Sequence, residues 1–475
     1  MAEVSPALRV TLPVAAAMRP VPPALPPDAP LAEAVRAMAI DSAVLAVDAE
    51  GRPLGILTER DVARRVAFRL PPETPLGAAM TAPLITCEAD SHLWRAIALL
   101  RAHALRHLPV LDRAGRCVGM LHRQEVLAAV AGRTLSHLDA LAGDDAAVKA
   151  AQAGLARSLL AEGVAAPDIV RLVSGINLDL HRRVMARALR AHGAPPVGIT
   201  LLVMGSAGRG ESLLRPDQDN GLLLEAYGEE ARPAVDAWFP AFAETLNAGL
   251  EEAGFPLCTG GIMARNAAWR GTRMEWAARF GQWARQRAGE ALLHAGIAFD
   301  FIGVDTAGSV AGNPAAELRR ALGPMLRAQS ALLGAMAAQD RQLTVALNPW
   351  GGFRRDRGGR TDLKLGGLMP LVAATRLLAL QHGVEETGTP ERLVALAARG
   401  ALKEGEAEGL HGAHAALLGA VLQQQLLDHE AGRMPGSRVA IAALPRAEQD
   451  RLREALRAVR RFTKAAFAGF TGEVW

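Results

Sequence analysis

Residues 201–225 read LLVMGSAGRGESLLRPDQDNGLLLE, and this stretch decides the fold of the domain that contains it. An apolar run that predicts a strand leads directly into a Gly-Ser turn at Gly205 and Ser206. Two carboxylates, Asp217 and Asp219, follow, and a second apolar run after them predicts another strand. Because side chains alternate between the two faces of an extended chain, Asp217 and Asp219 point the same way.

This pair of carboxylates favours a metal site. Neighbouring carboxylates raise each other's pKa, so Asp217 and Asp219 are kept together at low cost if they bind a divalent metal. Oxygen ligands suit Mg²⁺, and two such ions activate an attacking oxygen and stabilise a leaving oxygen in nucleotidyl transfer. The turn at Gly205 and Ser206 allows close approach of a phosphate and supplies N–H and hydroxyl donors.

The same residues carry a family resemblance. Gly-Ser, a ten-residue gap and Asp-x-Asp on a strand resemble the nucleotidyltransferase superfamily of DNA polymerase beta. The longer string GSAGRGES…DQDN (205–220) is similar to that of bacterial nucleotidyltransferases with an N-terminal CBS domain pair, relatives of the protein-PII uridylyltransferases. The resemblance covers nearly the whole chain. It implies an α+β multidomain protein with a tandem CBS pair, a polymerase-beta-type domain with a mixed sheet, and an all-α C-terminal domain.

A third metal ligand is expected from a later strand. Asp300 stands inside the apolar run IAFDFIGV (297–304), where a charged side chain needs partners. The family resemblance points to the same residue as the third carboxylate. The alternative is a salt bridge from Asp300 to an arginine.

Further residues beside the motif are candidates for substrate binding. Arg209 is placed to grip a triphosphate through two hydrogen bonds, and Glu211 to orient it. Gln218 and Asn220 match family positions and are candidates either for supporting the metal ligands from behind or for contacts to the nucleotide; the alternative for each is packing within the turn. Ser206 is expected to bind phosphate and not to act as a nucleophile, because a hydrolase elbow needs glycine two places before the serine.

Two later segments are candidate neighbours of the site. GGIMARNAAWRGT (260–272) resembles a family segment and predicts a loop near it. The basic run 354–360, with Asp362 and Lys364, predicts either a basic lip for the triphosphate or a solvated loop. TDLKLGGLMPLV (361–372) resembles the signature of the C-terminal domain.

The first 130 residues contain an internal repeat. DAEGRPLGILTERDV (48–62) and DRAGRCVGMLHRQEV (112–126) align at an offset of 64 with six identities in fifteen. Each copy begins with an AAM segment and predicts a helix followed by two strands joined by an Asp/Gly turn. The helices are expected at 31–38 and 93–102, and the strands at 44–47, 54–57, 108–111 and 117–121. This pattern resembles a tandem CBS pair.

The CBS resemblance implies a regulatory site for an adenosine nucleotide between the repeats. Gly55, Thr58 and Asp61 supply the Gly-x-x-Thr-x-x-Asp ligand signature in the first copy, with the hydroxyl and carboxylate on phosphate and ribose. At the corresponding places the second copy has Gly119, His122 and Glu125. Because imidazole does not replace a hydroxyl conservatively, we expect at most one orthodox site. The alternative is a pair that serves only dimerisation or docking.

Four segments follow from these patterns. We expect a CBS pair over 1–135, a helical connector over 136–196, a catalytic domain over 197–314 and a helical C-terminal domain over 315–475. In the last segment, helices are predicted over 368–382, ended by glycine, and over 413–427 and 446–467, and Thr389 is a predicted N-cap.

Composition limits the class of protein. Half of the 475 residues are hydrophobic and 21% are charged, as in soluble globular proteins. No apolar run reaches the ~18 residues of a membrane span, and three scattered cysteines argue against a disulfide framework. We therefore expect a cytoplasmic protein without a membrane partner, and a homodimer formed through the CBS pair. The net charge of +4 does not favour nucleic acid as a partner.

The predicted function is metal-dependent nucleotidyl transfer. An NTP with two Mg²⁺ ions on Asp217, Asp219 and Asp300 would donate NMP to an acceptor hydroxyl and release pyrophosphate. The uridylyltransferase resemblance suggests a protein acceptor and a role in signal transduction. The alternatives are a catalytically silent CBS nucleotide sensor or scaffold acting through protein partners, and a transferase acting on nucleic-acid ends.

Overall fold

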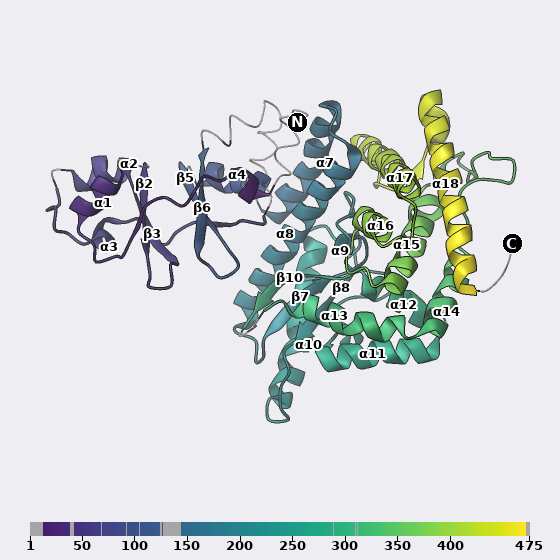
Figure 1. The fold of residues 1–475 in the computed structure, drawn as a ribbon, viewed down its shortest axis with the longest axis horizontal. Coiled ribbons are helices and arrows are strands. Elements are labelled where there is room, and N and C mark those ends of the chain that lie inside the picture. Colours follow the sequence, from purple (N-terminus) through teal and green to yellow (C-terminus); the bar gives the residue numbers. More distant parts are fainter. Residues whose placement is uncertain are drawn as a thin grey trace. The chain divides into compact units, whose positions relative to one another are not determined.

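The computed structural model describes residues 13–471 except 39–41, 68, 92, 104, 124–125, 127–143, 288, 309 and 311. The chain divides into two compact units, Met1–Val164 and Ala165–Trp475, and each is described by itself (Figure 1).

The first unit contains two copies of one small motif. In the first copy, β1 (Ala24–Leu25) runs parallel to β2 (Ala43–Val47), which is antiparallel to β3 (Pro53–Thr58). The second copy repeats this sheet with β4 (Cys87–Glu88), β5 (His107–Leu111) and β6 (Cys117–His122). The helical segments are η2 (Val14–Ala16), α1 (Leu31–Ala37), α2 (Glu59–Asp61), η3 (Val62–Val66), α3 (Leu76–Ala79), α4 (Leu93–Ala102) and α7 (Asp145–Ala161).

The turns between the paired strands are built alike in both copies. The Asp48 carboxylate accepts hydrogen bonds from the backbone N–H groups of Glu50 and Arg52. Asp112 does the same for the two corresponding N–H groups of the second copy. An aspartate that bonds the backbone in this way fixes a tight turn, so the repeat read from the sequence is also a repeat in structure.

The two copies exchange their lead-in segments. Met80 lies on Gly55, where an added Cβ would come within 2.3 Å of the Met80 sulfur. In the same way Met18 lies on Gly119, where a Cβ would come within 2.5 Å of the Met18 sulfur. Each AAM segment therefore packs on the strand pair of the other copy. Gly55 has a packing role here, and this accounts for the glycine of the predicted ligand signature.

The second unit is built on a four-stranded mixed sheet of order β10-β7-β8-β9. Its strands are β7 (Ile199–Val203), β8 (Asn220–Leu224), β9 (Arg270–Thr272) and β10 (Ile302–Ala307). All residues of β7 and β8 are buried, as expected of near-continuous apolar strands at the centre of a sheet. The long helices α8 (Ala166–His192) and α10 (Arg232–Glu252) pack against each other. Shorter segments are α9 (Gly205–Gly208), η4 (Ala267–Trp269), α11 (Arg273–Gln286) and α12 (Glu290–Phe299).

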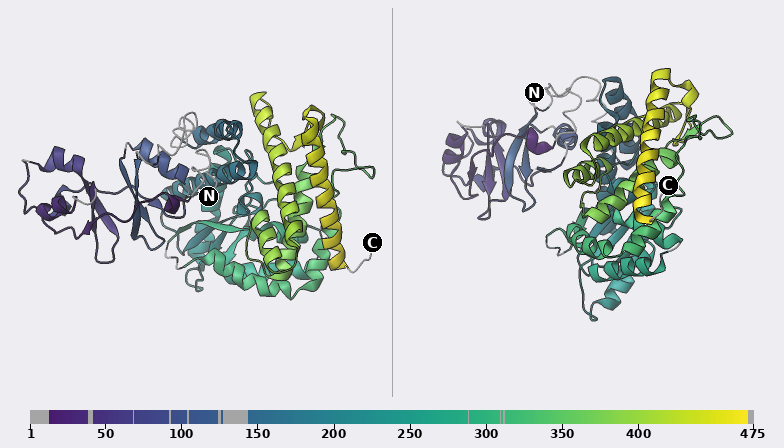
Figure 2. Two further views of the ribbon diagram at one scale, coloured as in Figure 1. Left: turned by 45° about the horizontal axis from the view of Figure 1, so that its top comes forward. Right: turned by 45° about the vertical axis from the view of Figure 1, so that its right-hand side comes forward.

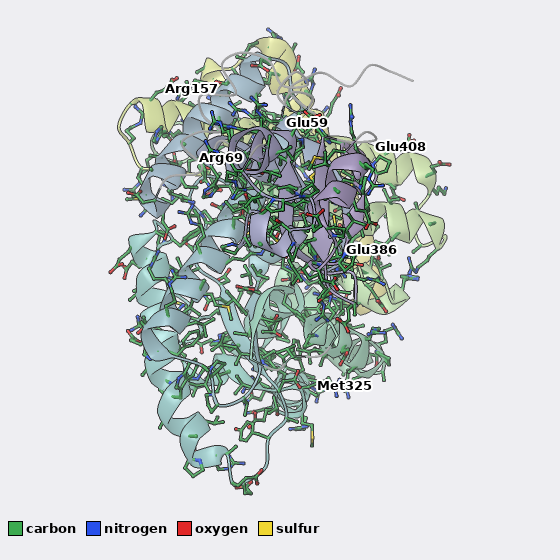
Figure 3. All side chains as sticks on the ribbon, turned by 90° about the vertical axis from the view of Figure 1, so that its left-hand side faces the viewer. Glu59, Arg69, Arg157, Met325, Glu386 and Glu408 are labelled. Atoms are coloured by element: carbon green, nitrogen blue, oxygen red, sulfur yellow. The ribbon has the colours of Figure 1, made fainter. Side chains whose placement is uncertain are left out.

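The rest of the second unit is almost entirely helical. Its elements are α13 (Pro314–Arg327), α14 (Ser330–Asp340), β11 (Thr361–Asp362), η5 (Lys364–Leu368), α15 (Met369–His382), α16 (Thr389–Ala398), α17 (Glu404–Glu430), β12 (Arg438–Val439), η6 (Ile441–Ala443) and α18 (Arg446–Thr471). The last two long helices, α17 and α18, pack side by side (Figure 2). Charged side chains such as Glu386 and Glu408 are exposed on this part of the molecule (Figure 3).

The predicted fold class, α+β with mixed-sheet and helical parts, is confirmed. The predicted strands and most predicted helices are present to within a few residues, and Gly383 ends α15 with a φ of 66°. The helix predicted over 413–427 is longer, because α17 already begins at Glu404 and ends at Glu430. Two further details differ. Gly388, not Thr389, is the N-cap of α16, and Asp300 lies in the turn between α12 and β10 instead of on a strand. Within the described residues, no helix is long and apolar enough to span a membrane.

Candidate active site

A pocket of about 350 Å³ lies between the mixed sheet and the C-terminal helices of the second unit. Its charged lining residues are Arg209, Asp217, Asp219, Asp340, Lys364 and Arg376. Apolar side chains from α12, α14 and α15 form the remaining wall. A concave site with an apolar wall and a few convergent charged groups is the usual form of a small-molecule site.

Asp217 and Asp219 both face this pocket from the extended segment that leads into β8. The alternating residues Gln218 and Asn220 point the other way and are fully buried. There the Asn247 amide donates to the side-chain oxygens of Gln218, at 2.7 Å, and of Asn220, at 3.0 Å. Gln218 and Asn220, predicted either to support the metal ligands or to contact the nucleotide, anchor the segment from behind.

The environment of Asp219 disfavours a free negative charge. Burial, aided by the charge of Asp217, raises the pKa of Asp219 to about 6 against the lowering effects of the Cys258 thiol, Lys364 and Arg209. A cation bound by both carboxylates would remove this repulsion. The two side chains therefore fit the oxygen-ligand chemistry of Mg²⁺.

The Gly-Ser turn lies directly against Asp219. Gly205 has a φ of +61°, and a Cβ on it would come within 2.5 Å of the Asp219 Oδ2 atom. The Met204 N–H donates to the Asp219 carbonyl oxygen at 2.8 Å. Gly205 and the half-buried Ser206 lie in α9 beside the pocket, whereas Arg209 lines it.

Replacing Gly205 by alanine is expected to lower any activity of this pocket by roughly 10²-fold, because the new methyl group displaces the Asp219 carboxylate. Gly210→Ala is the matched control, since Gly210 also has a positive φ, +70°, but nothing lies within 4 Å of an added Cβ. Steady-state kinetics of both variants separate the clash from backbone strain. Equal losses in the two variants would contradict this prediction.

Asp300 has a different environment from that of the predicted third metal ligand. Its carboxylate is fully buried, and Oδ2 accepts hydrogen bonds from Arg209, at 2.8 Å, and from Arg376, at 2.8 Å. Its Oδ1 lies 2.7 Å from the Arg392 guanidinium. Burial alone would raise the pKa of Asp300, but the charges of Arg376, Arg392 and Arg209 hold it well below its ordinary value.

Three arginines thus surround one carboxylate, and we call Asp300, Arg209, Arg376 and Arg392 the arginine cluster. The turn that carries Asp300 is also held by Arg319, which donates to the carbonyl oxygens of Phe299 and Phe301. Among the described residues, no group of three or more His, Cys, Asp or Glu side chains is arranged to hold a metal ion. The structure therefore does not bring Asp300 together with Asp217 and Asp219.

Glu211 extends this cluster toward the helical part of the unit. Its carboxylate accepts from Arg209 Nε at 2.8 Å and from the Thr389 backbone N–H at 2.7 Å. Burial raises the pKa of Glu211, but the charges of Arg209 and His414 hold it below its usual value. The prediction that Glu211 orients Arg209 agrees with this contact.

The helical part supplies lining residues that the sequence did not single out. Arg376 on α15 and Asp340 at the end of α14 line the pocket. Arg376 is a charged residue within a long apolar run, and this pattern indicates a buried partner. The sequence could therefore have marked Arg376 as a candidate. Of the predicted basic lip, Lys364 lines the pocket, whereas Arg354 and Arg357 are exposed. The segment 260–272, predicted as a loop near the site, contributes Gly260 and Ile262 to the pocket, but its second half forms η4 and β9.

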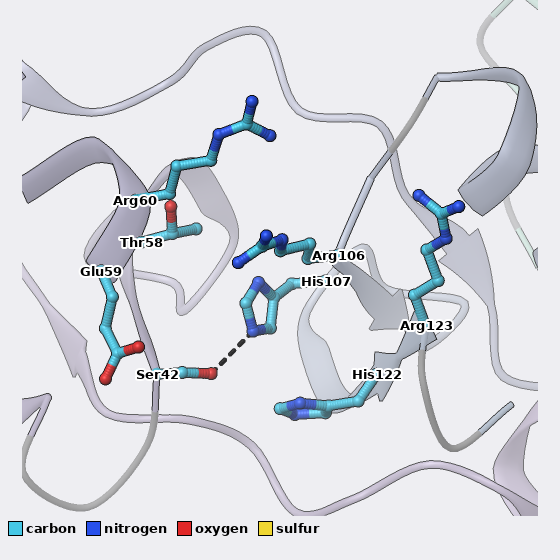
Figure 4. A pocket seen from close by; sticks show the side chains of 8 residues that line it. All are labelled: Ser42, Thr58, Glu59, Arg60, Arg106, His107, His122 and Arg123. Atoms are coloured by element: carbon cyan, nitrogen blue, oxygen red, sulfur yellow. Dashed lines mark hydrogen bonds between the residues drawn. The ribbon is translucent and has the colours of Figure 1, made fainter. Parts of the chain in front are cut away.

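A second pocket, of about 680 Å³, lies within the first unit between the two repeats (Figure 4). Ser42, Thr58, Glu59 and Arg60 line it from the first copy, and Arg106, His107, His122 and Arg123 from the second. Ser42 and His107 are joined by a hydrogen bond of 2.7 Å. At the 64-residue offset, arginines 106 and 123 replace Ser42 and Glu59, so the second copy makes this pocket basic.

Of the three residues predicted to bind the CBS ligand, the structure places one in the pocket between the repeats and gives the other two structural roles. Thr58 lines the pocket between the repeats. Thr58 is the N-cap of the short helix α2, and Asp61 completes a capping box, because its carboxylate accepts from the Thr58 backbone N–H at 3.1 Å. The same carboxylate accepts from the Thr58 hydroxyl at 2.7 Å and pairs with Arg65 at 2.8 Å. Gly55 packs on Met80, as described above. Glu125 lies outside the described residues.

Comparison with known protein families finds matches to several parts of the chain. Residues 150–290 match the family described as "Putative nucleotidyltransferase DUF294". Residues 330–470 match the "Putative nucleotidyltransferase substrate binding domain" of the same family. Residues 14–67 and 76–132 each match the CBS domain.

Individual relatives cover smaller parts. An uncharacterized protein of Methanopyrus kandleri is 33% identical over 86 residues, which are 18% of this chain and 44% of that protein. The chain thus spans less than half the length of this curated relative. A CBS domain protein of Pyrobaculum aerophilum complexed with AMP is 27% identical, over 24% of this chain and 89% of that chain, with a TM-score of 0.23. A CBS-domain protein of Agrobacterium tumefaciens is 29% identical, over 23% and 90%, with a TM-score of 0.21.

The matches to the CBS domain fall on the two copies in the first unit, and the match to "Putative nucleotidyltransferase DUF294" includes the Gly-Ser turn and the paired aspartates of the second. The chain thus carries matches to a pair of CBS domains, to this nucleotidyltransferase model and to the "Putative nucleotidyltransferase substrate binding domain".

Proposed function

We propose that the 350 Å³ pocket is the active site of a metal-dependent nucleotidyltransferase. The observation that carries the proposal is the pairing of Asp217 and Asp219 on one pocket wall, opposite cationic side chains from the helical part. The matches to one nucleotidyltransferase model and to one nucleotidyltransferase substrate binding domain support the same reaction class.

In this proposal each pocket residue has a defined task. Asp217 and Asp219 would hold two Mg²⁺ ions, which supply Lewis-acid activation of the phosphates. Arg209, Arg376 and Lys364 face the same space and would bind the triphosphate oxygens. The acceptor oxygen attacks the α-phosphorus, the bond to the bridging oxygen of pyrophosphate breaks, and the acceptor proton passes to solvent. Positioning and electrostatics contribute most of the rate in such a reaction.

The arginine cluster positions two of these cations. Three guanidinium groups face the carboxylates of Asp300 and Glu211, so the group carries a surplus positive charge. Arg209 and Arg376 reach from this cluster to the pocket wall. We therefore assign to Asp300 a positioning role in place of metal ligation.

Label transfer tests this function. Each of four α-labelled NTPs is incubated with Mg²⁺ and a native lysate, and the full chain is compared with Asp217→Asn/Asp219→Asn. A labelled product that appears only with the unaltered chain would establish the reaction, and its size and chemistry would identify the acceptor. A uridylyltransferase-like reaction predicts label from UTP on a protein.

The arginine cluster favours a second candidate function, a nucleotide-binding sensor without transfer. A carboxylate held by three arginines is not available as a third metal ligand. In this case the chain would bind NTP with Mg²⁺ yet label no acceptor with any of the four nucleotides, with or without AMP or ATP for the CBS pair.

The CBS pair is proposed to regulate the second unit by binding an adenosine nucleotide in the basic pocket between the repeats. Thr58 is the one residue of the predicted signature that faces this pocket. Regulation requires that the ligand bind two states of the protein with different affinity. We further propose that the protein is cytoplasmic and that it dimerises through the CBS pair. We also propose that the first three of the four segments end at residues 135, 196 and 314.

Charge in the CBS pocket predicts how affinity depends on the ligand. Arg106→Ala and Arg123→Ala are each expected to weaken ATP binding by roughly tenfold, because a charge-assisted hydrogen bond contributes about 1.5–3 kcal/mol. Binding of AMP should fall less, since it carries fewer phosphate charges. Titration calorimetry with AMP, ADP and ATP checks this. Arg113→Ala is the control, because Arg113 is 82% exposed and pairs with Asp90; an equal loss there would contradict the assignment.

A further inference from the structure

Asp340 is a carboxylate of the candidate active site that the proposed chemistry leaves unused. It ends α14 and lines the pocket next to Gln339. Burial raises its pKa to about 6, while the charge of Arg376 lowers it. Within the described part of the chain, no side-chain hydrogen bond or ion pair holds this carboxylate. A partly buried carboxylate without a partner is costly unless a ligand completes it.

Asp340 is not part of the metal pair. Among the described residues, no three carboxylates are close enough together to bind one ion. Asp340 lines the pocket from the end of α14, whereas Asp217 and Asp219 line it from the segment that leads into β8. Because it comes from another element, we take Asp340 to meet a part of the substrate other than the metal-bound phosphates.

The wall around Asp340 suits a flat, apolar-faced group. Met336 precedes it by one helical turn, and Leu293 and Ile297 of α12 and Met369 of α15 also line the pocket. A nucleobase has two apolar faces and a polar edge, so these side chains can sandwich its ring while Asp340 and Gln339 meet its edge. Both lie in the segment matched to the family's substrate-binding domain.

A carboxylate selects among bases because it only accepts hydrogen bonds. Guanine presents a ring N–H and an exocyclic amino group side by side, which match the two oxygens of one carboxylate. Adenine and cytosine place an acceptor nitrogen next to their amino group, and uracil places carbonyl oxygens on both sides of its N–H. Each of these three would set a lone pair against the Asp340 carboxylate.

We propose that Asp340 is a specificity-determining residue that accepts hydrogen bonds from the ring N–H and amino group of guanine, and thereby selects GTP as the nucleotide. This inference rests on the proposed function, since it requires that the pocket hold an NTP. It names the substrate that the paired aspartates and the arginine cluster would process.

The test is competition binding to the full chain with labelled GTP and Mg²⁺, with ATP, UTP, CTP and ITP as competitors. ITP lacks only the amino group of GTP. The nucleotide bound at the active site is measured as the binding that is lost in Asp217→Asn/Asp219→Asn. Nucleotide bound by the CBS pair remains in that variant. We expect GTP to exceed ITP by roughly tenfold or more in the unaltered chain. In Asp340→Asn the ratio of GTP to ITP should fall to about one, because the amide cannot accept two hydrogen bonds side by side.

The outcomes separate the inference from the function on which it rests. An NTP that binds without preference for GTP, or a GTP preference that survives Asp340→Asn, overturns the inference and leaves the nucleotidyltransferase proposal standing. No binding of any NTP at the site overturns both. Asp236→Asn, an exposed change on α10, is the control for general effects, and it should keep the GTP to ITP ratio of the unaltered chain.

Discussion

Asp219→Asn is expected to lower kcat/KM for nucleotidyl transfer by at least about 10³-fold. The amide keeps the shape of the side chain but removes the charge that would hold a divalent cation, and such electrostatic groups contribute about 10²–10³-fold or more each. Because Asp217 stands beside it on the same wall, each aspartate depends on the other for the site. Asp217→Asn should therefore show a loss of similar size, and the double variant little more than either single one.

The loss should come without unfolding. The pKa of Asp219 lies above its ordinary value, at about 6, so a neutral side chain at this place relieves burial of a charge and repulsion from Asp217. Thermal unfolding of Asp219→Asn should therefore match or exceed that of the unaltered chain. Asp236→Asn, on the exposed face of α10, is the matched control. A fully active Asp219→Asn protein would exclude the assigned site.

Asp300→Asn is expected to act in the opposite way, on stability first. Removing one partner of a buried ion pair leaves the other charge uncompensated, at about 3–5 kcal/mol in the free energy of unfolding. Here three guanidinium groups would lose the Asp300 carboxylate at once, and of these Arg209 keeps its pairing with Glu211. The Arg209 and Arg376 side chains are only 11–12% exposed, and Arg392 is fully buried. Denaturant unfolding of the second-unit transition measures the effect. A variant that unfolds like the unaltered chain yet loses activity would favour metal ligation by Asp300 instead.

This destabilisation has a defined pH dependence. The folded-state pKa of Asp300 is depressed, so the stability that its ion pairs contribute is present above the unfolded pKa, about 3.9. It is lost as the pH falls from there through the folded pKa. The difference in unfolding free energy between the unaltered chain and Asp300→Asn should be constant from about pH 5 to 8 and shrink at lower pH. A difference that grows on acidification would contradict this assignment.

The sequence predicts the part of the site that local geometry determines. Alternation along an extended chain places Asp217 and Asp219 on one wall, and it also turns Gln218 and Asn220 away from it. The first consequence was predicted and the second was overlooked. Likewise the repeated Asp/Gly turns and apolar runs located the strands of both CBS copies, because those signals lie within a few residues of each other.

The environment of Asp300 could not be predicted in this way. Its partners are Arg209, directly after α9, and Arg376 and Arg392 on α15 and α16, which follow more than 150 residues later. The sequence places the charged residue Asp300 in an apolar run and therefore predicts a partner for it. An arginine and a metal ion would both serve as that partner. Only the packing of the helical part against the sheet distinguishes them. The same packing brings Asp340 into the pocket, and no local signal marks that residue.

The exchange of Met18 and Met80 between the CBS copies has an evolutionary consequence. Met80 of the second copy covers Gly55, and Met18 of the first copy, together with the Arg19 carbonyl, covers Gly119. A duplicated half that comes to rely on its twin in this way can no longer be deleted or inherited alone. The residues that line the pocket can therefore differ between the two copies, as Arg106 and Arg123 in place of Ser42 and Glu59 show. Each copy nevertheless still needs the other for its packing.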